Sequence, residues 1–259
     1  MVAEILRHIN QIFLSRCLKG RRHNPPEDAT TAKKAWRRTN KQDIRKACYK
    51  NQHGLCAYTE LSLDNTELGC HLEHIAPRSI YPERTFLPKN IILSTLGEVQ
   101  SGSLQPHDQF AGHHKSETYS DDWFITPFDE DCAIYFKYAL MGLVEVSPDL
   151  DASAQIKADK TIQALNLNAD YLVACRKKSL QALNHKIEAL LAENSLPNLK
   201  SEPSNLSDRE KVARFELSQL AKDSLELSDK KLPEFYSAKK QLFASVMKYE
   251  NGLSLLQLL

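Results

Sequence analysis

The stretch that decides the fold is CHLEHI, residues Cys70–Ile75, which the chain continues as APRS at 76–79. A short run of mixed apolar and polar residues is typical of a strand, and Pro77 predicts that the strand ends soon after His74. Glu73 and His74 are neighbours, so in a regular strand their side chains point to opposite faces. Taken alone, the pair fits a polar strand end as well as it fits an active site.

The segments around this strand predict a small mixed centre of strands and one short helix. LCAYTEL (55–61) and CHLEHI flank a turn-rich segment, so we expect them to pair as a β-hairpin. A second pair of strands is expected in DCAIYFKY (131–138) and MGLVEV (141–146). HDQFAGHHKSET (107–118) lies between the two pairs and predicts a short helix.

Helical patterns fill both ends of the chain. Apolar residues at helical spacing from Ile5 to Phe13 predict a helix that ends near Lys19-Gly20, and a second helix is expected from Ala29 to about Tyr49. After Asp151 the periodicity is helical throughout, with Ser207 and Glu210 as a capping box. We therefore expect an α+β, mostly helical fold in three parts: a basic helical arm at 1–52, a core at 53–150, and a helical region at 151–259 that docks a partner.

The charge of the chain is unevenly placed although its net value is only +1. The segment 16–50 holds twelve Lys and Arg against three acidic residues, so its local charge is about +9. One reading is a solvated basic helix. The other is a phosphate-binding surface, because clustered cations gain free energy by releasing counterions from nucleic acid. On the second reading the contacts come from Lys33, Lys34, Arg37 and Arg38.

Several features point to a cytoplasmic protein. The first fifteen residues include charged positions and do not read as a signal peptide, and no apolar run has the roughly 18–20 residues needed to span a bilayer. The six cysteines form no C-x-x-C pair. A reduced, cytoplasmic protein without a membrane partner is the expectation.

Side chains suited to hydrolysis gather between positions 56 and 115. A neutral imidazole can accept the proton of a water that attacks phosphorus, and a divalent metal can neutralise the scissile phosphate. A carboxylate, an imidazole and waters suit Mg²⁺ or Mn²⁺, while Ni²⁺ or Zn²⁺ could bind adventitiously. The candidates are Glu73, His74, Asn90, His107, Asp108, His113 and His114.

Four segments together resemble the HNH, or ββα-metal, nuclease motif: HGLCAYTE (53–60), LEHIAPRS (72–79), KNIILSTLG (89–97) and GHHKS (112–116). The resemblance implies a ββα-metal core between the two helical regions and a metal-dependent endonuclease. In that core Glu73 is a metal ligand and His74 is the general base. Asn90 orients the base or the metal-binding loop.

The resemblance leaves open which helix residue completes the metal site. The common spacing places Gly112 there, and glycine has no side chain to bind a metal. His113 is the first choice, His114 the second and His107 a distant third. Lys115 matches a lysine that commonly follows the ligand, and we count it among the nucleic-acid contacts.

The region after this core, WFITPFDEDCAIYFKYALMGLVEV (123–146) with ALNLNADYLVACRKKSL (164–180), is similar to the PtuB family. PtuB is the nuclease subunit of the Septu anti-phage systems and also occurs beside some retrons. The resemblance implies an ATPase partner similar to PtuA, a DNA or RNA substrate and, where a retron is present, a reverse transcriptase–msDNA complex as a further partner.

Departures from the motif keep other readings open. Many HNH proteins hold a structural zinc with four cysteines, but here the first pair reads Cys56-Ala57-Tyr58-Thr59 and Ala111 stands in the second. We therefore expect no structural zinc and apolar packing instead. Arg78 either clamps a phosphate or pairs with Glu73. The rival functions are a non-catalytic nucleic-acid-binding adaptor and a cysteine–histidine hydrolase that uses Cys56 or Cys70.

Overall fold

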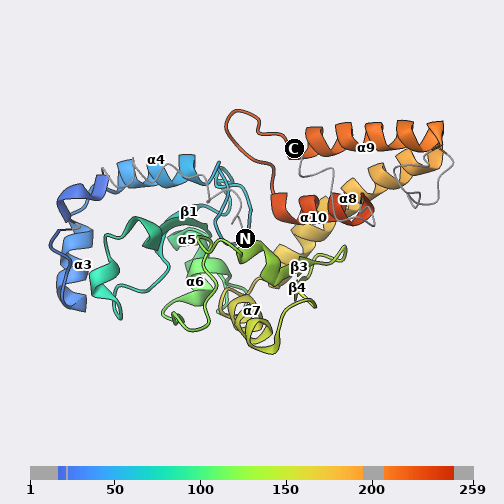
Figure 1. The fold of residues 1–259 in the computed structure, drawn as a ribbon. Helices are drawn as coiled ribbons and strands as arrows, with labels where there is room; N and C mark the ends of the chain where they lie inside the picture. Colours follow the sequence, from blue (N-terminus) through green and yellow to red (C-terminus); the bar gives the residue numbers. More distant parts are fainter. Residues whose placement is uncertain (1–16, 22, 195–206, 248–259) are drawn as a thin grey trace.

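The computed structural model describes residues 17–21, 23–194 and 207–247. This part of the chain is an α+β fold, about half helical, with two antiparallel two-stranded sheets (Figure 1). Most of the predicted first helix lies outside the described residues, but its predicted end near Lys19-Gly20 falls in the described stretch 17–21, which is helical. The helices are α3 (Ala29–Arg37), α4 (Lys41–Asn51), α5 (Glu98–Gly102), α6 (Ala111–Lys115), α7 (Ala152–Ala164), α8 (Asp170–Glu193), α9 (Asp208–Leu225) and α10 (Tyr236–Val246), and the strands are β1 (Cys70–His74), β2 (Ile91–Thr95), β3 (Phe136–Tyr138) and β4 (Val144–Val146).

The first sheet pairs β1 with β2, so the predicted hairpin between 55–61 and 70–75 is wrong. Segment 55–61 instead folds back on itself, because the amide of Cys56 donates to the carbonyl of Leu61 at 2.8 Å. β2 is buried at every position and begins with the apolar run Ile91, Ile92 and Leu93, which faces β1 residues Leu72 to His74 in the register. The register sets Glu73 opposite Ile92, and the chain between the strands makes a long excursion over 75–90.

The expected helix from Ala29 to Tyr49 is two helices. Asn40 separates them, since its side chain accepts from the amide of Gln42 and caps the start of α4. Asparagine favours such caps over helix interiors because its short side chain bonds the nearby backbone. The capping box of Ser207 and Glu210 at the start of α9 is confirmed, as is the sheet of β3 and β4.

One large apolar core joins all three predicted parts of the chain. It includes Trp36 of α3, Ile92 of β2 and Leu172 of α8. A second cluster fills the space between α8, α9 and α10 around Leu217 and Phe243. Figure 1 shows α3 and α4 on one side, the α8–α10 group on the other, and β1, α5 and α6 between them. In the described ranges, no helix combines the length and apolar character that crossing a bilayer requires.

Candidate active site

The site is built on β1, β2 and α6, which lie against one another. Short helix α6 approaches the sheet at Gly112, whose amide donates to the Ser94 hydroxyl on β2 at 3.2 Å. A Cβ at position 112 would lie 2.7 Å from Nε2 of His71, closer than side chains tolerate. Glycine at this position therefore lets the helix sit directly against β1.

The face of β1 that meets α6 carries buried charge. One carboxylate oxygen of Glu73, Oε1, lies 2.9 Å from Nζ of Lys115, and the other, Oε2, lies 3.4 Å from Nε2 of His71. Burial alone would raise the pKa of Glu73, but the contact with His71 and the charge of Lys115 outweigh it and hold the pKa below its ordinary value. The carboxylate is therefore ionised at neutral pH.

The opposite face of β1 carries His74, which is neutral at physiological pH. Its Nε2 lies 3.0 Å from the carbonyl oxygen of Thr85, and its ring meets Trp36 edge-on with 4.4 Å between ring centroids. A carbonyl only accepts hydrogen bonds, so Nε2 carries the proton and Nδ1 keeps a lone pair. Burial and then the charge of Arg78 lower the pKa of His74 to about 3.

Asn90 holds the excursion between the strands in place. Its side-chain oxygen accepts from the amide of Ala76 at 2.7 Å, and its amide donates to the carbonyls of Ala76 at 3.1 Å and Arg84 at 3.0 Å. Three hydrogen bonds thus tie both ends of the loop to one buried side chain. Thr85, which fixes the His74 ring, belongs to the same loop.

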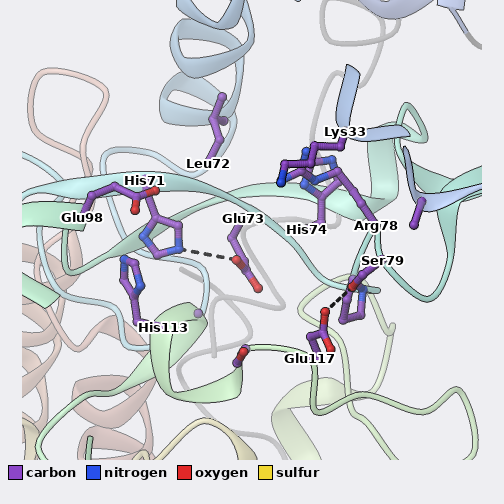
Figure 2. Close-up of a pocket in the computed structure, with 14 residues that line it drawn as sticks. Lys33, His71, Leu72, Glu73, His74, Arg78, Ser79, Glu98, His113 and Glu117 are labelled. Atoms are coloured by element: carbon purple, nitrogen blue, oxygen red, sulfur yellow. Dashed lines mark hydrogen bonds and ion pairs between the residues drawn. The ribbon is translucent and has the colours of Figure 1, made fainter. Parts of the chain in front are cut away.

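A hollow of about 460 Å³ opens between β1, α3, the loop after β1 and α6. Figure 2 shows Glu73 at its centre, His71 and His113 on one side, and Lys33, His74 and Arg78 on the other. Acidic and basic groups therefore line the same cavity. Ser79 and Glu117 close the side of the hollow away from His71.

The three candidate histidines for the metal occupy different places. His113 lines the hollow, with 4.2 Å between its ring centroid and that of His71. His114 lines a separate hollow, beside Trp123 and Lys160. The side chain of His107 is 80% exposed and lies 3.5 Å from the carboxylate of Asp108. Only His113 of these three shares the cavity with Glu73.

The two cations next to the site differ from expectation. Lys115 is completely buried, and its ammonium also donates to the carbonyls of His74 and Ser116, so this position does not offer it to a nucleic-acid backbone. Arg78 is half-buried, with its guanidinium carbon 5.5 Å from the ring centroid of Trp36. The buried ion partner of Glu73 is therefore Lys115, whereas Arg78 stacks on an aromatic ring and borders the hollow.

The predicted basic surface is exposed. Lys33, Lys34 and Arg37 lie on α3, and Arg38 caps its end. Lys33 faces the hollow, while the others continue the positive charge along the helix. The arrangement leads from a basic helix into the cavity that holds His74.

Cys56 and Thr59, at the positions compared with the zinc ligands of HNH proteins, each form a hydrogen bond with Thr95. The hydroxyls of Thr59 and Thr95 lie 3.1 Å apart, and the amide of Thr95 donates to the Cys56 sulfur at 3.3 Å. Ala111 is buried nearby in the same apolar core. Packing at this point is thus partly polar, where apolar packing alone was expected.

The side chains in the hollow fit a divalent ion through a small number of ligands. Nε2 of His113 is buried without a hydrogen-bond partner in the described part of the chain, and the ionised Glu73 shares its cavity. Across the same residues, no three or more His, Cys, Asp or Glu side chains stand ready-made as a metal cage. Waters and a substrate phosphate would complete the coordination of such an ion.

Sequence reasoning missed one member of the site, His71. It stands two residues before Glu73, and alternation along a strand puts both side chains on one face. That spacing was the available signal.

Comparison with known proteins adds no assignment. A scan of this chain against protein-family models found no match, and a search of curated proteins found none either.

Proposed function

We propose that this protein is a metal-dependent endonuclease of the HNH type, which hydrolyses phosphodiester bonds of nucleic acid. The observation that carries the proposal is the arrangement on β1, β2 and α6. One hollow joins an ionised carboxylate, Glu73, an imidazole whose Nε2 has no hydrogen-bond partner, His113, and a neutral imidazole, His74. Such a set can bind a cation and activate water within one cavity.

His74 is suited to the role of general base. Its Nε2–H is held by Thr85, so the ring is fixed and Nδ1 is free to take a proton from water. The low pKa keeps the ring neutral at physiological pH but also makes it a weak base. Binding of a phosphate next to Arg78 would offset the positive charge of that guanidinium and raise the basicity of His74 in the complex.

Asn90 acts through the loop. By holding Ala76 and Arg84 it fixes the segment that carries Thr85, and Thr85 orients the base. Asn90 is therefore a positioning residue in this proposal.

Glu73 and His113 would hold a divalent metal, Mg²⁺ or Mn²⁺, with Lys115 keeping the carboxylate ionised. When bound, the metal supplies charge neutralisation at the scissile phosphate and at the leaving oxygen. His113 is the better candidate than His114, because His114 faces a different hollow. The substrate backbone enters along Lys33 and Arg78, whose charges complement phosphate.

The proposed partners follow from the resemblance to the PtuB family. An unrestrained nuclease would damage its host, so an ATPase subunit similar to PtuA is the expected regulator, with the helical region of α8–α10 as its docking surface. A retron reverse transcriptase–msDNA complex is the second proposed partner, and anti-phage defence in the cytoplasm is the proposed role.

The test is incubation of the purified chain with plasmid DNA and with total RNA, with and without the ATPase partner and EDTA. We expect cleavage that EDTA abolishes, and a loss of roughly 10²–10⁴-fold in the His74→Ala variant. In the arms without the ATPase partner, His185→Ala, an exposed position on α8, is the matched control. Cleavage that persists in EDTA, or wild-type cleavage by His74→Ala, would overturn the proposal.

One observation favours a second candidate, a nucleic-acid-binding adaptor without catalysis. Lys115 already neutralises Glu73, so the carboxylate does not require a metal ion to be stable in the fold. An adaptor would bind nucleic acid through α3 and retain its biological activity in the His74→Ala variant.

A further inference from the structure

His71 places its second ring nitrogen, Nε2, against a carboxylate. Its Nδ1 lies 2.8 Å from the carbonyl oxygen of Leu96, which only accepts hydrogen bonds, so Nδ1 carries a proton. In the neutral ring Nε2 is then an acceptor, and it lies 3.4 Å from Oε2 of Glu73. Two acceptors that face each other in a largely buried place need a cation between them, either a proton or a metal ion.

A third acceptor lies close to these two. The ring of His113 is 4.2 Å from that of His71, centroid to centroid, and its Nε2 is buried with no hydrogen-bond partner among the residues that the structure describes. A buried, unpaired ring nitrogen costs free energy unless something binds it. His71, Glu73 and His113 therefore each bring an atom that can bind a proton or a metal ion to the same part of the hollow (Figure 2).

The space for this arrangement comes from Gly112. A Cβ at that position would lie 2.7 Å from Nε2 of His71 and 3.0 Å from the carboxyl carbon of Glu73. The backbone at Gly112 is outside the left-handed region, so its conformation does not demand glycine. What demands glycine is the imidazole of His71, which fills the place where a side chain from α6 would point.

We propose that His71, Glu73 and His113 together bind one divalent transition-metal ion, with His71 in the place of a ligand from position 112. The inference rests on the proposed function in that it names the ligands and the metal class of the same site. The 3.4 Å between Nε2 of His71 and Oε2 of Glu73 is close to the separation of two ligands around a tetrahedral ion, about 3.3 Å for bonds of about 2.0–2.1 Å.

Neighbouring contacts agree with ligation. Metal-binding histidines usually donate their second ring N–H to a carbonyl or carboxylate, as His71 does to Leu96. Lys115 occupies Oε1 of Glu73 and leaves Oε2 for the ion. Two imidazoles and one carboxylate favour Mn²⁺ or Zn²⁺ over Mg²⁺, which prefers oxygen ligands and keeps its waters. Ion binding must draw the three side chains closer than they stand in the structure.

The test measures metal binding without nucleic acid. Mn²⁺ is titrated into the full chain, and the free ion is followed by electron paramagnetic resonance. We expect one bound Mn²⁺ per chain, at least about tenfold weaker binding in His71→Ala and in His113→Ala, and unchanged binding in His185→Ala. A tenfold excess of Mg²⁺ should leave most of the Mn²⁺ bound. No binding by the wild type, or wild-type binding by His71→Ala, overturns the proposal.

A relocated ligand tests the role of position 112. Gly112→His alone should clash with His71 and lose binding, whereas the double variant His71→Ala/Gly112→His should regain most of the affinity lost in His71→Ala. If a folded double variant binds no better than His71→Ala, His71 does not stand in for position 112. Circular dichroism checks folding of each variant.

If His71→Ala fails to fold, ¹⁵N spectra of the wild-type imidazoles decide. Addition of Zn²⁺ should shift Nε2 of His71, and an unchanged signal overturns the proposal. Parallel cleavage assays separate the two conclusions. If metal binding depends on His71 but no nucleic acid is cleaved, only the proposed nuclease activity is refuted. If EDTA abolishes cleavage but metal binding does not depend on His71, only the assignment of His71 as a ligand is refuted.

Discussion

The two faces of β1 each bury a polar side chain, but one of these side chains is ionised and the other is neutral. On the α6 face, Glu73 remains ionised because Lys115 and His71 surround it. On the Trp36 face, one residue further on, His74 stays neutral because its burial and the nearby charge of Arg78 lower its pKa. A strand of five residues thus separates an ionised side chain from a neutral one. In the proposed function, that separation lets a cation site and a general base stand side by side.

The largest effect on stability should come from removing the cation that pairs with Glu73 on the α6 face of β1. Lys115→Met leaves the carboxylate of Glu73 buried without its cation, and we expect the free energy of unfolding to fall by about 3–5 kcal/mol. Urea denaturation measures the change.

The double variant Glu73→Gln/Lys115→Met removes both charges and should recover much of that loss, because no unpaired ion stays buried. Equal destabilisation in the single and double variants would show that the lysine stabilises by packing alone. The ion pair between Glu73 and Lys115 would then not be what stabilises the α6 face of β1.

The next largest effect concerns the 75–90 loop, which contains Thr85, the hydrogen-bond partner of His74. Asn90→Ala deprives Ala76 and Arg84 of their hydrogen-bond partners inside the protein, so we expect a loss of about 2–3 kcal/mol in urea denaturation. Asn184→Ala, in the middle of α8 with a bond to Glu188, should change stability far less. A comparable loss of stability in the two variants would show that the hydrogen bonds of Asn90 do not hold the 75–90 loop in place.

Much of this site could be predicted from sequence because local rules govern it. Alternation along a strand places Glu73 and His74 on opposite faces, and the structure has them so. Strand β1 ends at His74, just before the Pro-Arg of 76–79. The short helix expected within 107–118 is α6.

The errors arose where tertiary contacts decide. The pairing of β1 depended on the apolar face of β2, which lies beyond the 75–90 excursion, and proximity in sequence pointed to the wrong partner. Lys115 looks like a surface cation in sequence, yet the buried charge of Glu73 draws it inside. His71 joined the site only once α6 was placed against the strand at Gly112.

The neutral state of His74 in the folded protein should affect how the stability of the protein depends on pH. The pKa of His74 falls to about 3 on folding, so the unfolded chain binds a proton below about pH 6.5 that the folded chain does not. The stabilising contribution is complete above pH 6.5 and is lost as the pH falls toward 3. Between pH 6.5 and pH 5 we expect a loss of about 1–2 kcal/mol.

Stability against urea at several pH values provides the measurement, and the His74→Gln variant isolates this residue. The difference between wild type and variant should shrink on acidification, while other groups cancel. A difference that does not vary with pH would mean that His74 is solvated in the folded state.

The smallest effect distinguishes the lysines that belong to the two faces. Lys115 is buried behind the α6 face, whereas Lys33 is exposed where α3 borders the hollow on the Trp36 side. Lys33→Gln should therefore leave stability unchanged but weaken nucleic-acid binding a few-fold. It should also reduce the slope of log affinity against log salt by about 1, because one phosphate contact is lost.

Lys178→Gln, exposed on α8, should leave both quantities unchanged. Fluorescence anisotropy with a labelled duplex across a salt series separates these outcomes. An unaltered slope in Lys33→Gln would mean that the backbone does not enter along α3, and the basic helix would then be a solvated surface, the other reading of its charge.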